Sequence, residues 1–333
     1  MSQSPRFVTS FDPPIGVLED VAPGIRRIVA ANPGPFTFRG TGTYVIGRGD
    51  VAVIDPGPSD ERHIAMLMRQ LRGETITHVL VTHTHPDHSP GCVPLRAHTV
   101  ASTYGFGPHP SDPEEHGNSD TPAIVEQGAP DAAVAQTDTQ NAEESGDRTF
   151  VPDGILRHGD FVHGTRWRAE AVHTPGHISN HLCFRVTFAA SPNERVLFSG
   201  DHVMGWSTSV ISPPNGDLRN YLESLELLQG AGDTRYWPTH GAVITEPEAL
   251  IAGLLVHRKR RTEQIVELLR AGDATIAALV AAMYVGLDVR LVKAAGRSVL
   301  AHLVDLERRG DVSSSKVDDL GGPSAPVYRL VGR

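Results

Sequence analysis

The sequence predicts an α+β protein with a strand-rich body and a small helical module at its C-terminal end. Short apolar strands separated by turn residues recur up to about residue 245, and helical periodicity dominates after it. The charge also changes sign. From His257 onward there are 13 Lys and Arg residues against 9 Asp and Glu, a net of +4, whereas the whole chain has −9, leaving −13 for the rest. We therefore expect one domain over residues 1–245 and a second over 246–333.

The body begins with strands and a helix. The stretch TYVIGRGDVAVIDPGP, residues 43–58, predicts two strands joined by a tight turn. A helix is expected from about Ser59, because apolar residues recur there at helical spacing: Ile64, Leu67, Met68 and Leu71. The next stretch, TITHVLVTH at 75–83, is nearly all apolar or β-branched. It predicts a strand buried on both faces.

Residues 108–148 interrupt this pattern. They are rich in Pro, Asp, Glu, Ser and Gly, have no sustained period, and contain ten carboxylates against Arg148. A stretch of this length inside a compact domain predicts a lid or a disordered insertion. After it, the pattern predicts strands within 164–177, 181–188 and 195–202, then a helix over 218–228.

The C-terminal module begins with a long helix. Thr245 is predicted as its N-cap, with Glu248 completing a capping box, and the helix can extend to Leu269. Two further helices and two short strands follow, at 275–284, 290–310, 311–316 and 325–331. Three helices followed by a terminal hairpin are typical of a winged helix-turn-helix.

Composition sets limits on location. The chain has no run of about 18 apolar residues, so no membrane span and no membrane partner are expected. The first residues, MSQSPRFVTSFDPP, lack the pattern of a signal peptide. The two cysteines, Cys92 and Cys183, are embedded in stretches that predict packed structure, which fits a reducing compartment without disulfides. We expect a cytoplasmic protein.

Four groups that bind metals are crowded into THTHPDH, residues 82–88: His83, His85, Asp87 and His88. The stretch begins where the buried strand ends. Neutral imidazole is the commonest metal ligand, and a His-x-His pair at a strand end directs two rings toward one point. Pro86 favours a bend after this pair, so that the last two groups can face a second metal.

Three further candidate ligands also follow predicted strands. HTPGH ends in His177, LFSGDH contains Asp201, and YWPTHG contains His240. Because each lies at a strand end, one edge of the sheets would gather them all. The sequence therefore predicts a metal site assembled from four separate segments.

The motifs THTHPDH, TPGH, SGD and PTHG, with IDPGP upstream, resemble those of the metallo-beta-lactamase superfamily. The resemblance covers roughly residues 15–245 and implies a four-layer αββα sandwich. It also implies a role for each ligand. The first metal would be held by His83, His85 and His177; the second by Asp87, His88 and His240; Asp201 would bridge both metals, and Asp55 would support the cluster from behind.

Such a site implies hydrolysis. Two divalent cations about 3.5–4 Å apart share a water and lower its pKa, which generates a hydroxide near neutral pH. Asp87 is expected to orient that hydroxide as well as to bind metal. Zinc is the first expectation, because the ligands are nitrogen and oxygen without sulfur; manganese or iron would accept the same set.

The substrate is less constrained. The C-terminal module is similar to the winged helix of the beta-lactamase-like protein 2 group, which includes single-strand endoribonucleases. We expect either hydrolysis of a small-molecule ester, thioester or lactone, or cleavage of single-stranded RNA; a non-catalytic nucleic-acid-binding regulator is the minor alternative. His181 is a candidate substrate contact. If 289–309 is helical, Arg290, Lys293 and Arg297 share one face that could contact phosphates. A homodimer is also compatible with a module of this kind.

Overall fold

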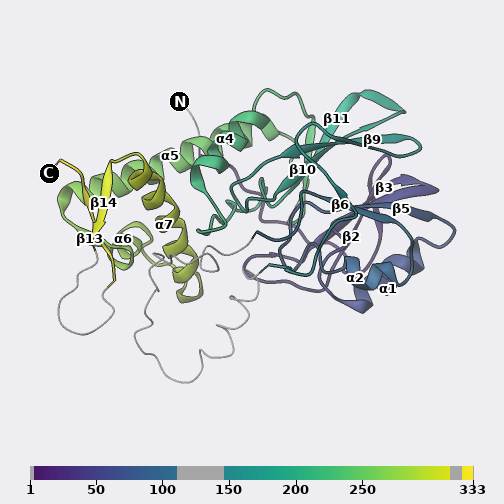
Figure 1. Ribbon diagram of the computed structural model, residues 1–333, viewed down its shortest axis with the longest axis horizontal. Helices are drawn as coiled ribbons and strands as arrows, with labels where there is room; N and C mark the ends of the chain where they lie inside the picture. Colours follow the sequence, from purple (N-terminus) through teal and green to yellow (C-terminus); the bar gives the residue numbers. More distant parts are fainter. Residues whose placement is uncertain (1–3, 111–145, 316–324, 333) are drawn as a thin grey trace, which may run out of the picture.

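The computed structural model describes residues 4–110, 146–315 and 325–332 of the chain. Figure 1 shows two strand-rich halves beside each other and the helical module at the far end of the molecule. Most of the acidic stretch 108–148 lies outside the described residues, so its role as a lid or disordered insertion stays a prediction. Within the described ranges, no helix has both the length and the apolar character needed to cross a membrane.

The first sheet has seven strands that follow the chain order. Neighbours are antiparallel as far as β4, and the pairs from β4 to β7 are parallel. The strands are β1 (Glu19–Ala22), β2 (Ile25–Val29), β3 (Gly42–Arg48), β4 (Asp50–Ile54), β5 (Thr75–Leu80), β6 (Ser102–Gly105) and β7 (Gly154–Ile155).

The second sheet has five strands in the order β12-β11-β10-β9-β8. Its pairs are antiparallel except β11 with β12, which is parallel. The strands are β8 (Phe161–His163), β9 (Trp167–His173), β10 (Leu182–Phe188), β11 (Ser191–Gly200) and β12 (Arg235–Pro238). All three strands expected in this half are therefore present.

Alternation along the strands determines which side chains enter each core layer. Within β3, Tyr44 points into the core between the two sheets, whereas Val45 belongs to the core under the helices. Across the inner core, the ring of Tyr44 meets that of Phe198 edge-on, with centroids 5.1 Å apart. The two cysteines are free and buried, as expected.

Helices cover both outer faces. Helices α1 (Glu61–Gln70) and α2 (Cys92–Arg96) pack on the first sheet. Helix α4 (Leu218–Leu228) and the first part of α5 (Pro247–Ala271) pack on the second. The order helix, sheet, sheet, helix confirms the expected αββα sandwich.

The C-terminal module has its own apolar core, formed by the second part of α5 together with α6, α7 and the small sheet. That sheet has the order β13-β15-β14 and is antiparallel. This is the expected winged helix. Its elements are α6 (Ile276–Met283), the 3-10 turn η2 (Val289–Leu291), α7 (Val292–Arg308), β13 (Ala274–Thr275), β14 (Val312–Ser315) and β15 (Val327–Leu330). Because α5 contributes to both cores, the boundary between residues 245 and 246 stays a prediction.

The predicted capping box of α5 is wrong. The helix begins at Pro247 after Glu246, and no side chain caps it. Proline fits the first helical position because the N–H it lacks would have no partner there. The Glu248 carboxylate instead accepts a hydrogen bond from the backbone N of Gly230, at 3.0 Å, and so joins α5 to the loop after α4.

Candidate metal centre

The predicted ligands all lie just beyond strand ends. The first four follow β5, which belongs to the first sheet. The other three follow strands of the second sheet: His177 comes after β9, Asp201 directly after β11, and His240 after β12. The two halves of the sandwich therefore contribute ligands from opposite sides to one edge.

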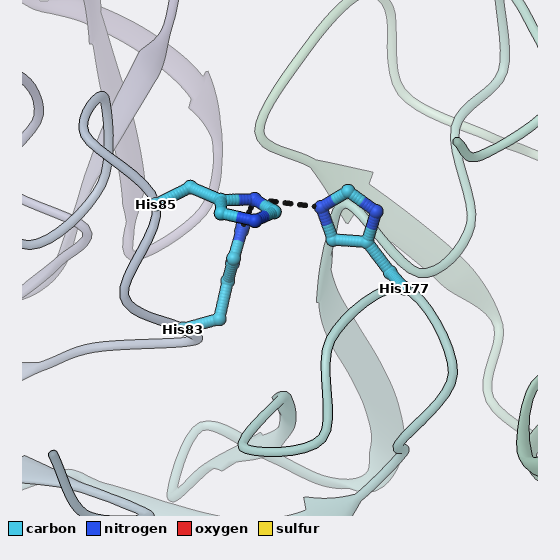
Figure 2. A group of neighbouring side chains, drawn as sticks. All are labelled: His83, His85 and His177. Carbon is cyan, nitrogen blue, oxygen red and sulfur yellow. Dashed lines mark hydrogen bonds between the residues drawn. The ribbon is translucent and has the colours of Figure 1, made fainter. Parts of the chain in front are cut away.

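Three imidazoles converge in the first cluster. His85 Nδ1 lies 2.9 Å from His83 Nε2 and also 2.9 Å from His177 Nε2. Figure 2 shows His83 and His85 on one loop and His177 reaching toward them from a facing loop. Three ring nitrogens within 4.8 Å of one another form a ligand set suited to one metal ion.

The second cluster combines a carboxylate with two imidazoles. The ligand atoms of Asp87, His88 and His240 also lie within 4.8 Å of one another. Asp201 Oδ2 lies 3.4 Å from His240 Nε2, 3.6 Å from His88 Nε2 and 3.8 Å from His177 Nε2. This carboxylate thus faces both clusters, which is the position a bridging ligand requires.

The protonation tendencies of the two clusters differ. Burial lowers the pKa of His83 and His85 well below the usual value, which keeps both rings neutral and available as ligands. Although burial acts in the opposite direction, the carboxylates of Asp201 and Asp87 raise the pKa of His240 to about 10. The second cluster therefore favours positive charge beside its carboxylates, whether a proton or a metal cation provides it.

The buried polar atoms of the site fit divalent metal ions. His88 Nε2 and Asp201 Oδ1 are buried, and neither has a hydrogen-bond partner among the described residues. Leaving such atoms unsatisfied costs about 1–3 kcal/mol each, and a coordinated cation would remove that cost. Nitrogen and oxygen donors without sulfur suit zinc, manganese or iron.

Asp55 lies behind the cluster and contacts one of the candidate ligands. Its Oδ2 accepts hydrogen bonds from His88 Nδ1 at 3.0 Å and from the Thr82 hydroxyl at 2.7 Å. Its Oδ1 accepts from the Thr82 backbone N at 2.8 Å. These contacts fix His88 so that its other nitrogen, Nε2, faces the site.

Three supporting contacts were not predicted from the sequence. The Thr41 hydroxyl donates to Asp87 Oδ2 at 2.7 Å. His177 Nδ1 donates to the carbonyl of Val210 at 2.6 Å, and His240 Nδ1 donates to that of Gly40 at 3.2 Å. Backbone carbonyls leave no signal in a sequence, and Thr41 lies far along the chain from Asp87.

His181 lies behind the cluster. It is fully buried, its Nδ1 lies 2.9 Å from the Thr174 hydroxyl, and its Nε2 accepts a hydrogen bond from the Asp201 backbone N at 3.2 Å. It is also absent from the described residues that line the cleft. The contacts of His181 are therefore those of a residue that positions Asp201, rather than those of a substrate contact.

A cleft of about 400 Å³ opens above the ligands. Its floor contains five of them, and its sides come from the loop at 35–37, the loop at 204–215 and the winged helix. The five ligands are His85, Asp87, His177, Asp201 and His240; the contributions of the winged helix are Tyr284, Leu287, Leu291, Ala294, Ala295, Arg297 and Ser298. Clefts of this size hold small-molecule ligands.

The three basic residues singled out in the module follow one another closely along the chain. Arg290 lies in the 3-10 turn η2, which leads directly into α7. Lys293 and Arg297 both lie on α7, and Arg297 lines the cleft. Contact of these residues with nucleic acid stays a prediction.

Comparison with known families agrees with this architecture. Residues 37–240 match the metallo-beta-lactamase superfamily, and residues 275–319 match the beta-lactamase associated winged helix domain. The chain therefore belongs to the metallo-beta-lactamase superfamily. A crystal structure of a beta-lactamase domain protein from Burkholderia ambifaria has the same fold, with a TM-score of 0.71 at 24% identity over 96% of this chain and 95% of that one.

Two curated relatives extend over both domains. An atrochrysone carboxyl ACP thioesterase from Aspergillus terreus is 30% identical over 292 residues, covering 83% of this chain and 77% of the relative. A beta-lactamase-like protein 2 homolog from Drosophila melanogaster is 30% identical over 302 residues, covering 88% and 91%. The second similarity confirms the resemblance to the beta-lactamase-like protein 2 group. The family and these relatives support hydrolase activity.

Proposed function

We propose that this chain is a metal-dependent hydrolase that cleaves a small-molecule acyl ester, with a thioester as the preferred class and a lactone as a close chemical variant. The proposal rests above all on the cleft. It opens directly onto the predicted ligands, and much of its lining is apolar, including Met204, Trp206, Leu287 and Leu291. Such walls suit the carbon skeleton of an acyl substrate. The printed name of the Aspergillus terreus relative, a thioesterase, supports the same class.

The two ligand sets would hold divalent metal ions, and such ions would lower the pKa of a water and polarise the scissile carbonyl. Side chains of the protein would orient the water and transfer protons. Asp87 lines the cleft, and the Thr41 hydroxyl holds its Oδ2, so its carboxylate is fixed where it can orient the attacking water and accept a proton. Attack forms the new C–O bond, the C–S bond breaks, and the thiol leaves with a proton.

RNA cleavage is the competing activity. Proteins that bind single strands combine a positively charged groove with stacking side chains. Among the described residues that line this cleft, Arg297 has the only Lys or Arg side chain, so the walls away from the predicted metal ligands offer little positive charge to a chain of phosphates. This charge distribution favours a small substrate over a polyanion.

The decisive experiment compares substrates on zinc-loaded protein: an acyl thioester, a lactone and a fluorogenic single-stranded RNA. We expect thioester turnover that falls by about 100-fold or more in Asp87→Ala, because both a ligand and the group that orients water are lost. Asp20→Ala, which removes an exposed carboxylate on β1, serves as the matched control and should keep full activity. Metal-dependent RNA cleavage with inert thioester and lactone would overturn the proposal.

A further inference from the structure

The winged helix forms one wall of the metal-site cleft, and most of that wall is apolar. Tyr284 follows α6 directly, Leu287 and Leu291 come next along the chain, and Ala294 and Ala295 lie in the first turn of α7. None of these residues is a candidate ligand. The cleft therefore joins the floor, where the ligands lie, to an apolar surface supplied by another domain.

This wall is fixed in place before any substrate arrives. Leu287 packs against the apolar core of the module, and Ala295 belongs to that core. The module is in turn attached to the sandwich. Arg219 Nε of α4 lies 3.3 Å from Asp305 Oδ1 of α7, and Ala301 of α7 joins the apolar core beneath the second sheet. A preformed apolar wall can bind hydrocarbon without a cost for ordering its own side chains.

The sandwich contributes further apolar surface to the cleft. Phe36, Met204 and Trp206 all line it. The ring of Trp206 stacks on that of Phe38, with centroids 4.7 Å apart and an angle of 7° between the planes. Stacking of this kind holds the indole in one orientation. A molecule that extends from the ligands to the winged helix would therefore contact apolar groups of both domains.

We propose that the winged helix binds the apolar acyl chain of the substrate and thereby selects thioesters by the length of that chain. This inference rests on the proposed hydrolase function and names the part of the substrate that the module contacts. The scissile carbonyl would lie over Asp87 and the other ligands. The acyl chain would extend from there to Leu287 and Leu291.

The thiol portion of the substrate fits a different part of the cleft. Hydroxyl groups of Ser207, Thr208 and Ser212 line it along the loop at 204–215. Hydroxyls both donate and accept hydrogen bonds, so they suit a thiol that contains amide groups. The polar and apolar portions of the lining thus correspond to the two sides of an acyl thioester.

Two series of thioesters test which side of the molecule contacts the winged helix. In the first, N-acetylcysteamine is joined to acetyl, butyryl, hexanoyl, octanoyl or decanoyl groups. In the second, the acetyl group is kept and the thiol is lengthened from ethanethiol to octanethiol. On zinc-loaded protein we expect kcat/KM in the first series to rise by about two- to fourfold per added CH₂ until the chain fills the cleft. Across the second series it should change by less than about threefold.

Leu287 is tested by the ratio of kcat/KM for the octanoyl thioester to that for the acetyl thioester. Leu287→Asn places a polar group in the wall, so this ratio should fall by about 10-fold or more. Leu287→Met keeps an apolar side chain of similar volume and should retain most of the ratio. Val285→Asn is the matched control, because Val285 is 91% exposed and does not line the cleft.

A second variant fills the cleft instead of changing its polarity. Ala294→Leu adds bulk to the wall on α7, so kcat/KM for the octanoyl thioester should fall by about 10-fold relative to that for the butyryl thioester. Ala282→Leu makes the same change at an exposed position of α6 and should leave the ratio as it is in the wild type.

The outcomes separate this inference from the hydrolase function. Thioester turnover that does not depend on acyl length, or an unchanged ratio in both Leu287→Asn and Ala294→Leu, would overturn the role of the winged helix and leave the hydrolase function intact. A rise in kcat/KM with the length of the thiol alone would assign the wall to the other side of the substrate. No turnover of any thioester would refute the hydrolase function and this inference with it.

Discussion

At the scale of single residues, Asp55 shows how hydrogen bonds hold the side chains of the candidate site in position. It follows β4 directly and has a φ of 49°, a left-handed conformation that non-glycine residues seldom adopt. In this conformation its carboxylate reaches His88, Thr82 and also the hydroxyl of Thr239, which donates to Oδ2 at 3.2 Å. Backbone strain at such a position persists only where surrounding contacts compensate for it, and these hydrogen bonds provide that compensation.

We therefore expect Asp55→Asn to weaken the second metal site. An amide keeps the size of the side chain but cannot accept from His88 and both threonines in the same way, so metal affinity should fall by about 10–100-fold. A competition titration with a zinc chelator measures this. Asp60→Asn, at the half-buried N-cap of α1 and away from the candidate ligands, is the control. Unchanged affinity in Asp55→Asn would show that the rest of the cluster orients His88 without help.

The same scale shows what sequence can reveal about the site. The seven candidate ligands could be located because each sits in a short motif after an apolar strand, as with THTHPDH after β5. Thr41 could not be found, because a threonine in GTGTY has no pattern that distinguishes it, and only the fold brings it to Asp87. The sequence makes His181 a candidate substrate contact, yet its ring is directed into the protein interior.

At the scale of elements, α5 links the two domains and also supports a wall of the cleft. Arg258, in the first part of α5, is almost fully buried and donates to the carbonyl of Ser209 at 2.5 Å. The Ser209 hydroxyl in turn donates to the carbonyl of Asp201 at 2.6 Å. The guanidinium also lies over the ring of Tyr221, with its carbon 5.2 Å from the ring centroid. Helix α5 is thus connected, through Ser209, to the backbone of the candidate metal ligand Asp201.

Arg258→Met should lower the free energy of unfolding by about 2–3 kcal/mol, because the carbonyl of Ser209 loses a charged donor inside the protein. Urea unfolding monitored by circular dichroism measures the change. Arg260→Met removes a neighbouring exposed arginine of the same helix and should change stability by less than about 0.5 kcal/mol. Equal free energies of unfolding for the two variants would contradict the idea that Arg258 anchors the loop at 204–215.

Whether a segment forms a helix or a strand could be predicted where its apolar residues recur at regular spacing. The residues at which helices begin could not be predicted as well. Helix α1 begins at Glu61 with Asp60 as its cap, close to the expected start near Ser59. The start of α5 was predicted incorrectly, because Thr245 and Glu248 fit a capping box while Pro247 determines where the helix begins. Similarly, a single helix was considered over 289–309, whereas in the structure the 3-10 turn η2, which contains Arg290, precedes α7.

At the scale of the whole molecule, net charge distinguishes the two candidate substrates. The chain has a net charge of −9, so a polyanion would be repelled at long range. We expect thioester turnover to change by less than about threefold between about 50 and about 200 mM salt, because at most one ion pair with the substrate is screened. Binding of single-stranded RNA through six to ten phosphates would weaken by about 10²–10⁴ over the same range. Steady-state kinetics at several salt concentrations would reveal the difference.

The four-layer arrangement was expected from the resemblance of the motifs to a known family, and the winged helix from the order of three helices and a terminal hairpin. The position of the winged helix relative to the sandwich could not be predicted from the sequence. The contacts that place the module, such as Arg219 with Asp305, join residues that share no motif and lie far apart in the chain. The part of the winged helix in the cleft wall therefore became visible only in three dimensions.

That wall has an evolutionary consequence. The predicted metal ligands all lie before residue 241, whereas the residues of the winged helix that line the cleft lie in the last part of the chain. Under the proposed function, mutations in the winged helix would change the cleft wall without changing the predicted metal ligands. Related proteins with this arrangement could therefore differ in the substrate they accept while they keep the same metal ligands.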